Sequence, residues 1–173
     1  MVATRLRDTA FKDVLQAIPL GTQVKIEGPF GDFRLPNKTS RPAVVLSGGI
    51  GITPFRSILL QAAHEKRPYR IVFFYANRRP EDAPFLEEMR ALAREDPNFT
   101  FVPTMTKMEK SQLPWNGERG HIDQSMLARH LSGITDAIYY VTGPAGMVKA
   151  LRTVLNTAGV DDDDIRTEEF TGY

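Results

Sequence analysis

The sequence predicts an α/β fold, an open five-stranded parallel sheet of strand order 3-2-1-4-5 with helices on both faces. Three observations predict this fold class. Strand-like and helix-like stretches alternate from Ala43 onward, Val44–Leu46 is apolar enough for a strand buried on both faces, and glycine turns follow two predicted strands. The first forty residues differ and look like the tail of a β-rich domain.

The other elements follow in order along the chain. After the first strand, which begins at Ala43, further strands are expected where β-branched and aromatic residues gather, at Arg70–Tyr75, Thr100–Thr104, Ala137–Thr142 and Ile165–Phe170. Helices are expected at Pro84–Arg94, from an Asp123 cap through Leu131, and at Ala145–Ala158, ended by Gly159. The polar stretch Lys107–Arg119 is interpreted as a surface loop anchored by Trp115, and Asp161–Asp164 as a solvated turn.

Composition limits the classes of function. The 173 residues are 42% hydrophobic and 25% charged with a formal charge of +1, which is typical of a globular protein and argues against nucleic acid as the main partner. Without cysteine there is no disulfide, thiolate metal ligand or thiol nucleophile, and we expect a cytoplasmic location. No apolar stretch is long enough to cross a membrane. His64, His121 and His130 lack ligand spacing, so no metal site is expected.

The first glycine turn lies in Val44–Pro54, where an apolar strand leads into a helix that Pro54 helps to open. This order exposes backbone N–H groups at the positive end of a helix dipole, where a phosphate can bind. Gly49 and Gly51 approach the dinucleotide fingerprint, but Pro54 stands where its last glycine would be. Taken alone, the turn fits a plain connection equally well.

A second glycine turn, Thr142–Met147, again follows a strand and precedes a helix. In a sheet of order 3-2-1-4-5 the ends of the first and fourth strands flank the crevice where ligands bind. Two glycine turns would then face one crevice, which favours a dinucleotide site. A branched side chain at Gly51 is expected to abolish nucleotide binding while leaving the fold largely intact.

The N-terminal segment combines a helix-like piece at Thr9–Ile18, an alternating strand at Gln23–Glu27 and a turn at Gly28–Gly31. About forty residues cannot bury enough surface to fold alone. The segment therefore packs on the α/β domain, pairs with another chain, or belongs to a larger protein from which this chain is cut.

Four motifs in this order resemble the ferredoxin–NADP reductase family, whose flavin-dependent reductases feed electrons to oxygenases, ferredoxins or flavohaemoglobin haem. They are Gly28–Phe33, Gly48–Pro54, Thr142–Met147 and Glu168–Phe170. The resemblance implies an antiparallel barrel that holds FAD, followed by an NAD(P)-binding domain. Residues 1–40 would then be the C-terminal remnant of the barrel and residues 41–173 the NAD(P)-binding domain.

The resemblance also implies roles for residues around the two turns. The turn Gly48–Thr53, with Gly49 and Gly51, would hold the NAD(P)H pyrophosphate, and Thr53 would lie close to where nicotinamide meets flavin. Gly143, Pro144 and Met147 would border the nicotinamide. Phe170 would match the C-terminal aromatic near the isoalloxazine ring, and Glu168 a nearby carboxylate. The alternatives are an edge-strand core position for Phe170 and a solvated position for Glu168.

The chain departs from the family pattern at two places. Thr142 stands where the family often carries cysteine, which puts in doubt a role that needs a thiol. The family's flavin motif, an arginine and an aromatic before serine or threonine, is absent, so we expect this chain alone to bind FAD poorly or not at all. Thr9 could cap a helix that faces the FAD pyrophosphate, although an ordinary helix cap is the favoured interpretation.

The choice between NADH and NADPH depends on the residues after the second strand, because acidic residues there accept the ribose hydroxyls and arginine suits the extra phosphate. Asn77, Arg78 and Arg79 precede Glu81 and Asp82, so the signals conflict. The cofactors implied are NAD(P)H and FAD, and the electron acceptor is left open.

We therefore predict an FAD-dependent NAD(P)H oxidoreductase in which this chain supplies the nicotinamide-nucleotide site, passing electrons to an iron–sulfur or haem partner. Hydride transfer needs no strong acid or base, which fits the shortage of histidine. The alternatives are a nucleotide-binding module without flavin or reductase activity, and an α/β domain without a ligand.

Overall fold

A computed structural model describes residues 3–6, 8–28, 30–31, 33–36 and 40–170. The chain divides into two compact units, Met1–Asp32 and Phe33–Tyr173. No helix among the described residues is both long and apolar enough to span a bilayer.

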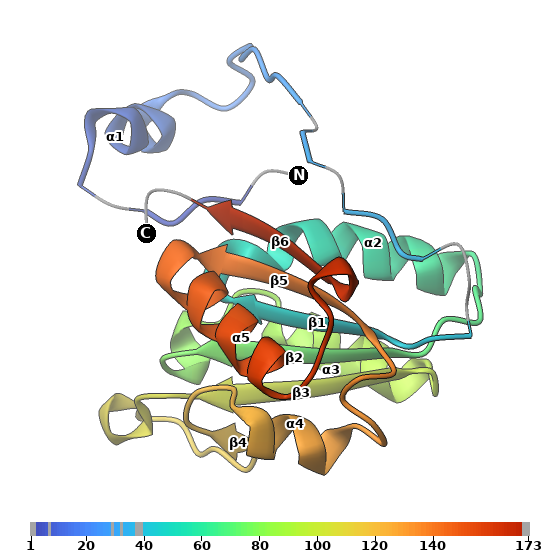
Figure 1. Cartoon of the computed structure of the whole chain (residues 1–173). Helices are drawn as coiled ribbons and strands as arrows, with labels where there is room; N and C mark the ends of the chain where they lie inside the picture. The colour runs from blue at the N-terminus through green and yellow to red at the C-terminus, as the bar shows by residue number, and fades with distance from the viewer. Residues whose placement is uncertain (1–2, 7, 29, 32, 37–39, 171–173) are drawn as a thin grey trace. The chain divides into compact units, whose positions relative to one another are not determined.

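The second unit contains one six-stranded parallel sheet of order β4-β3-β2-β1-β5-β6 (Figure 1). The strands are β1 (Ala43–Gly48), β2 (Ile71–Asn77), β3 (Phe99–Met105), β4 (Glu118–Arg119), β5 (Ile138–Pro144) and β6 (Ile165–Phe170). The predicted count of five strands is therefore wrong. The five predicted strands keep their predicted relative order, and β4 is added at the edge beyond β3.

The added strand lies in the stretch that was expected to be only a loop. Glu118 and Arg119 pair with Thr104 and Met105 of β3. The indole Nε1 of Trp115 donates a hydrogen bond to the carbonyl of Glu118 at 2.8 Å, and its ring is buried. Trp115 thus anchors the loop as expected, and the loop adds a short strand because its backbone groups find partners on β3.

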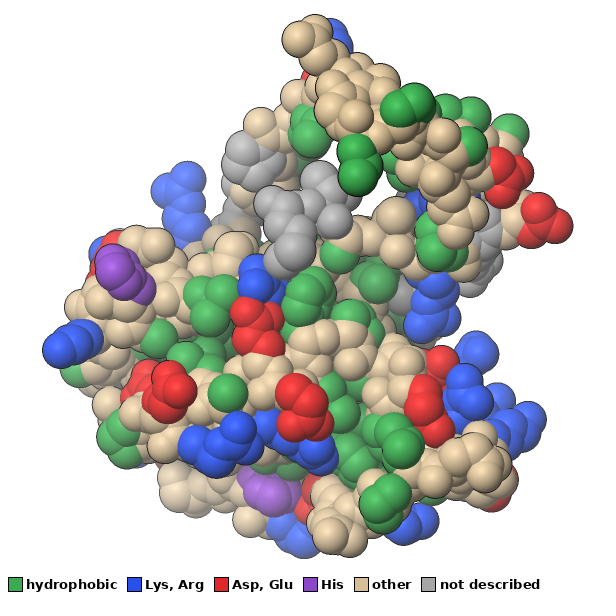
Figure 2. Space-filling model, turned by 180° about the vertical axis from the view of Figure 1, so that it is seen from behind, with side chains coloured by type: hydrophobic (Ala, Val, Ile, Leu, Met, Phe, Trp, Pro, Cys, Tyr) green, Lys and Arg blue, Asp and Glu red, His purple; other side chains and the backbone are tan. Residues whose placement is uncertain are grey.

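Helices cover both faces of the sheet, as predicted (Figure 1). Helices α2 (Ile52–His64) and α3 (Leu86–Glu95) pack over one face, and α4 (Gln124–His130) and α5 (Ala145–Thr157) over the other. All six residues of β1 are buried, because this central strand has helices on both sides. On the face seen in Figure 2, acidic and basic side chains are interspersed.

The predicted helix signals are present. The Asp123 carboxylate accepts a hydrogen bond from the Met126 amide at 2.7 Å and caps α4. Gly159 follows α5 with a φ of +88°, a left-handed conformation that glycine adopts without strain. Helix α3 begins two residues after the expected Pro84, because Phe85 is left-handed, with a φ of +59°, and cannot belong to a right-handed helix.

The first unit contains helix α1 (Ala10–Ala17), capped by Thr9, whose side chain accepts a hydrogen bond from the Lys12 amide. The strand expected at Gln23–Glu27 is not formed, and Val24 and Ile26 expose 58% and 70% of their surface. Alternation alone does not make a strand without a neighbouring strand to pair with. The barrel remnant stays a prediction, and Pro29 and Asp32 of its glycine motif lie outside the described residues.

The second unit starts with a strap, Phe33–Pro36, that packs on the α2 side of the sheet. The Phe33 ring lies edge-on to Tyr140 and tilted against Phe55, with centroids 5.7 and 5.1 Å away. The Tyr140 hydroxyl and the Arg166 guanidinium both donate to the Arg34 carbonyl, at 2.6 and 3.0 Å. Residues Phe33–Pro36 thus pack within this unit, and the domain division at residue 40 stays a prediction.

Candidate functional site

The two glycine turns meet at the carboxyl ends of β1 and β5. A Cβ atom added to Gly51 would lie 2.9 Å from the Thr142 carbonyl oxygen and 3.1 Å from the Gly143 backbone. A Cβ on Gly48 would press on the Met147 sulfur. Gly51 is therefore required by the close packing of one turn on the backbone of the other, and the structure brings the two predicted motifs together.

The first turn leads directly into α2. Gly49 has a φ of +55° and opens a 3₁₀ turn, Gly49–Gly51, from which α2 continues at Ile52. The Thr53 hydroxyl donates to the Ile50 carbonyl at 3.0 Å, and Thr53 and Pro54 are half-buried in the first helical turn. The amides of this turn have the arrangement that suits an anion at a helix N-terminus.

The second turn is formed by Gly143 and Pro144. Gly143 has a φ of +150°, a backbone conformation that is strained for any residue with a side chain. A Cβ there would also lie 3.4 Å from the Met147 sulfur. Pro144 occupies the N-cap position of α5, and Met147 is half-buried in the first turn of that helix. The Met147 thioether thus fills the space between the two glycine turns.

Three buried polar atoms at this edge of the sheet have no hydrogen-bond partner among the described residues. They are Ser47 Oγ, Asn77 Nδ2 and Thr142 Oγ1, close to the ends of β1, β2 and β5. Ser47 and Thr142 are neighbours in the strand register and are fully buried. Unpaired buried polar groups are costly and rare in native proteins. Three of them at the carboxyl ends of neighbouring strands therefore fit a site where a bound polar ligand supplies the missing hydrogen bonds.

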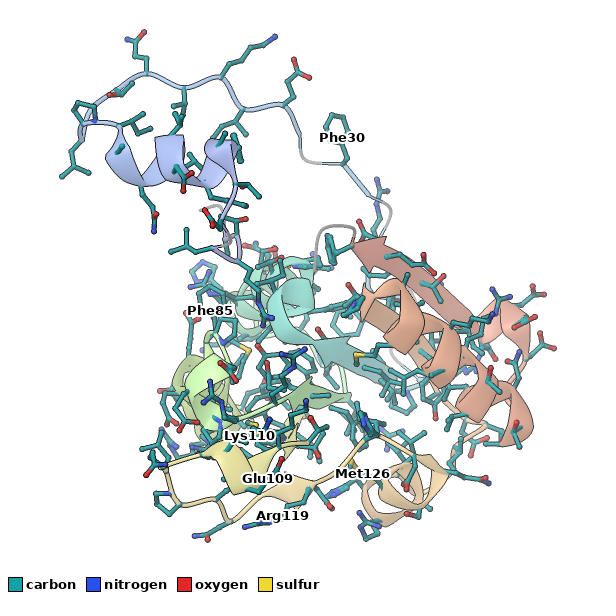
Figure 3. All side chains as sticks on the ribbon, turned by 90° about the vertical axis from the view of Figure 1, so that its left-hand side faces the viewer. Phe30, Phe85, Glu109, Lys110, Arg119 and Met126 are labelled. Carbon is teal, nitrogen blue, oxygen red and sulfur yellow. The ribbon has the colours of Figure 1, made fainter. Side chains whose placement is uncertain are left out.

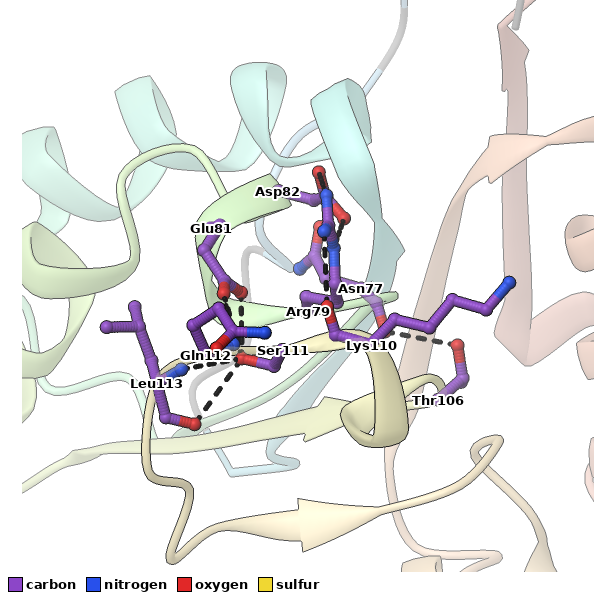
Figure 4. A network of polar contacts seen from close by, with 9 residues as sticks. All are labelled: Asn77, Arg79, Glu81, Asp82, Thr106, Lys110, Ser111, Gln112 and Leu113. Atoms are coloured by element: carbon purple, nitrogen blue, oxygen red, sulfur yellow. Dashed lines mark hydrogen bonds and ion pairs between the residues drawn. The ribbon is translucent and has the colours of Figure 1, made fainter.

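The loop after β2 forms a network of ion pairs and hydrogen bonds (Figure 4). Arg79 contacts Asp82 through two hydrogen bonds of 2.8 and 2.9 Å. Glu81 accepts from the Ser111 hydroxyl at 2.9 Å and the Gln112 amide at 3.0 Å. The pKa of Glu81 is lowered, chiefly by its own backbone N–H and further by these donors, against a smaller opposing effect of burial.

Arg78 differs from its neighbours in this loop. Its side chain is exposed and has no partner within the described part of the chain, whereas both nearby carboxylates are already hydrogen-bonded. Figure 3 looks onto this edge of the molecule, with Phe85 and Lys110 labelled on it. The loop therefore offers an unpaired cation beside the end of β2.

Strand β6 brings two more predicted residues to the second turn. Glu168 pairs in register with Thr142, and Phe170 with Pro144. Both side chains are half-buried. Thr9 lies in the other compact unit, where it caps α1.

Comparison with known proteins agrees with this geometry. The oxidoreductase NAD-binding domain family matches residues 45–153, a range that includes both glycine turns and the loop after β2. The chain belongs to this family. The ferredoxin reductase-like character expected from the motifs is thereby confirmed.

Relatives of the NAD-binding domain include longer reductases. One component of the Na⁺-translocating NADH-quinone reductase of Klebsiella pneumoniae is 33% identical over 161 residues, covering 88% of this chain and 38% of the relative. The propane 2-monooxygenase reductase component of Mycolicibacterium smegmatis is 29% identical over 158 residues, which cover 89% of this chain and 44% of the relative. The chain thus spans less than half the length of these curated relatives.

Among solved structures, the cytochrome b5 reductase domain of Ulva prolifera nitrate reductase superposes with a TM-score of 0.79. It is 24% identical and covers 94% of this chain and 66% of the other. This likeness shows the shared fold of the NAD-binding domain.

Two residues at the site were not predicted from the sequence. Ser47 precedes Gly48 in the first motif, and its position at the polar end of an apolar strand was an available signal. Tyr75 in β2 looks like an ordinary core aromatic, yet its hydroxyl lies 2.9 Å from the Gly49 carbonyl oxygen. No local pattern in the sequence reveals that contact.

Proposed function

We propose that this chain supplies the nicotinamide-dinucleotide site of a flavin-dependent NAD(P)H oxidoreductase. The observation that carries the proposal is the contact between the two glycine turns, flanked by the unpartnered hydroxyls of Ser47 and Thr142. This is the switch point of the sheet, where ligands bind in doubly wound folds. The family match and the reductase relatives support the same function.

In this proposal the backbone amides of Gly48–Gly51 and of the first turn of α2 bind the diphosphate of the dinucleotide. Thr53, Gly143, Pro144 and Met147 border the nicotinamide. Glu168 and Phe170, brought beside the second turn by β6, orient the reacting rings and exclude water. The flavin and the nicotinamide supply the hydride chemistry, and these side chains supply position.

The flavin part of the proposal concerns the first unit. This unit, most of the predicted segment 1–40, would contribute the C-terminal part of an FAD-binding barrel, with Thr9 capping α1 near the FAD pyrophosphate. The large exposed apolar side chains of this unit, including Phe11, Val14 and Ile26, support a surface that packs against further barrel segments. Electrons would pass to a redox partner that carries haem or an iron–sulfur centre, and the monooxygenase reductase relative supports an oxygenase as one such partner. A cytoplasmic location belongs to the same proposal.

For the coenzyme, we favour NADPH. Glu81 and Asp82 are hydrogen-bonded within the loop, whereas Arg78 has an exposed guanidinium that suits a 2′-phosphate. Asn77 completes the end of β2 with a buried amide that has no partner among the described residues. The coenzyme would then meet positive charge beside its adenosine ribose.

Titration calorimetry with NADP⁺ and NAD⁺ tests the nucleotide site. Saturable binding of NADP⁺, tighter than that of NAD⁺, is expected. An absence of binding and of any thermal shift with either nucleotide contradicts the proposal. A yellow protein that NADPH bleaches supports the reductase, whereas a colourless protein that binds NADP⁺ indicates a nucleotide-binding module.

A further inference from the structure

We infer that Tyr75 is a positioning residue that couples the two loops of the dinucleotide site, the first glycine turn and the loop after β2. The inference rests on the proposed function and adds a residue outside the glycine motifs. Tyr75 lies in β2, next to β1 in the sheet, and its side chain is fully buried.

The contact that carries the inference is made by one hydroxyl group. The Tyr75 oxygen lies 2.9 Å from the Gly49 carbonyl oxygen and 3.1 Å from the Pro84 carbonyl oxygen. Its ring packs against Phe73 and Phe101, with centroids 5.7 and 6.2 Å away, so the hydroxyl has little freedom to move. A single phenol proton is thus shared between two loops that follow different strands.

A left-handed residue lies at the first of these carbonyl groups and directly after the second. Gly49 has a φ of +55°, and Phe85, directly after Pro84, has a φ of +59°. That conformation is uncommon for a bulky residue and persists only where its surroundings hold it. The Arg56 guanidinium lies 4.8 Å from the centre of the Phe85 ring and is itself bound to Glu88 by two hydrogen bonds, each 2.6 Å long. Tyr75 and Arg56 therefore both hold the end of the second loop, through Pro84 and Phe85 respectively.

This arrangement gives Tyr75 a specific effect on binding. The first turn presents amides to the diphosphate, and the loop after β2 presents Arg78 to the adenosine ribose. A ligand that spans both loops needs them in one relative position, whereas a ligand held by the second loop alone does not. Loss of the hydroxyl is expected to weaken a whole dinucleotide more than a mononucleotide.

The variant Tyr75→Phe removes the hydroxyl and keeps the ring. The matched control is Tyr139→Phe, because Tyr139 is equally buried and its hydroxyl donates to the Ile134 carbonyl at 2.7 Å, away from both turns. Thermal unfolding and titration calorimetry are measured on the full chain with NADP⁺ and with adenosine 2′-monophosphate. We expect the Tm of both variants to fall by a similar amount, because each loses one buried, hydrogen-bonded phenol hydroxyl.

Binding then separates the two variants. Tyr75→Phe should raise the Kd for NADP⁺ about five-fold, the equivalent of one ordinary hydrogen bond, and leave the Kd for adenosine 2′-monophosphate within about two-fold. Tyr139→Phe should change neither. Equal weakening by both variants, an unchanged Kd for NADP⁺ in Tyr75→Phe, or equal weakening of both ligands overturns the coupling.

A second measurement keeps the inference separate from the proposed function. If the unmodified chain binds neither ligand, the proposed function fails, and amide hydrogen exchange still tests the link. Tyr75→Phe is expected to speed exchange at both Gly49–Ile52 and Asp82–Phe85. Faster exchange at only one of these segments, or at neither, overturns the inference.

Discussion

Arg41 and Asp164 lie 123 positions apart in the sequence and form a two-point ion pair, with nitrogen–oxygen distances of 2.8 and 2.6 Å. Arg41 also donates to the Ala137 carbonyl at 2.9 Å. The pair joins the segment before β1 to the segments before β5 and β6. Asp164 was expected to belong to a solvated turn, and this partner makes it part of the fold.

The ion pair predicts a pH-dependent stability. The hydrogen bond and charge of Arg41 hold the pKa of Asp164 below its usual value, against the smaller effect of burial. The stabilisation is therefore full above the unfolded pKa of about 3.9 and is lost as the pH falls through the lower folded pKa. Asp164→Asn should cost about 1 kcal/mol at pH 7, a modest figure because solvent screens the half-exposed Arg41.

Urea unfolding between pH 3 and pH 7 measures this effect. The difference between the parent and Asp164→Asn should shrink at the acid end of the range. Asp163→Asn is the control, because Asp163 is exposed and its carboxylate has no partner in the described part of the chain. A constant difference at all pH values would contradict the assignment.

Gly51→Ala should destabilise the domain by about 1–3 kcal/mol, because the new Cβ would press on the Thr142 carbonyl and push the two turns apart. This corrects the expectation that a side chain at Gly51 leaves the fold intact, since the glycine faces protein backbone. Nucleotide affinity should fall as well. Gly146→Ala is the matched control, as its Cβ meets open space, and it should be neutral or slightly stabilising in calorimetry.

Thr142→Val should separate stability from binding. The buried Thr142 hydroxyl has no partner among the described residues, so an isosteric apolar side chain should leave the free protein unchanged or up to about 1 kcal/mol more stable. The Kd for NADP⁺ should rise. Thr104→Val should instead destabilise the protein, because the Thr104 hydroxyl donates to the Gly120 carbonyl at 2.7 Å. Matching losses of stability in the two variants would argue against a ligand-facing role for Thr142.

Arg78→Ala should raise the Kd for NADP⁺ about ten-fold and leave that for NAD⁺ nearly unchanged, because only the former carries a 2′-phosphate. Arg70→Ala, which removes an exposed arginine just before the opposite end of β2, controls for the change in net charge. Fluorescence or calorimetric titration provides the measurement. Equal effects of the two variants on NADP⁺ would show that Arg78 acts only through overall charge.

Local patterns were sufficient for most of the sheet. Val44–Leu46 and the aromatic run in β2 are buried on both faces, and burial of that kind is readable from composition alone. The two-residue strand β4 is not, because its residues are polar and its pairing depends on the path of β3. The strand predicted at Gln23–Glu27 is not formed, because its alternating sequence has no neighbouring strand to pair with among the described residues.

The site divides in the same way. The glycine turns could be predicted because glycine, strand and helix follow one another within a few residues. The contact of Gly51 with Thr142, the link through Tyr75 and the Arg41–Asp164 pair could not, because each joins residues far apart in the sequence. Such contacts depend on the assembled sheet.

The strap Phe33–Pro36 has a practical consequence for chimaeric electron-transfer proteins. Its backbone is held by Tyr140 and Arg166, and the Phe33 ring covers part of Phe55. A chimaera that joins another protein's domain at residue 41 would lack Phe33 and would expose apolar surface on α2. Fusions joined before residue 33 should therefore aggregate less than fusions joined at the predicted boundary after residue 40.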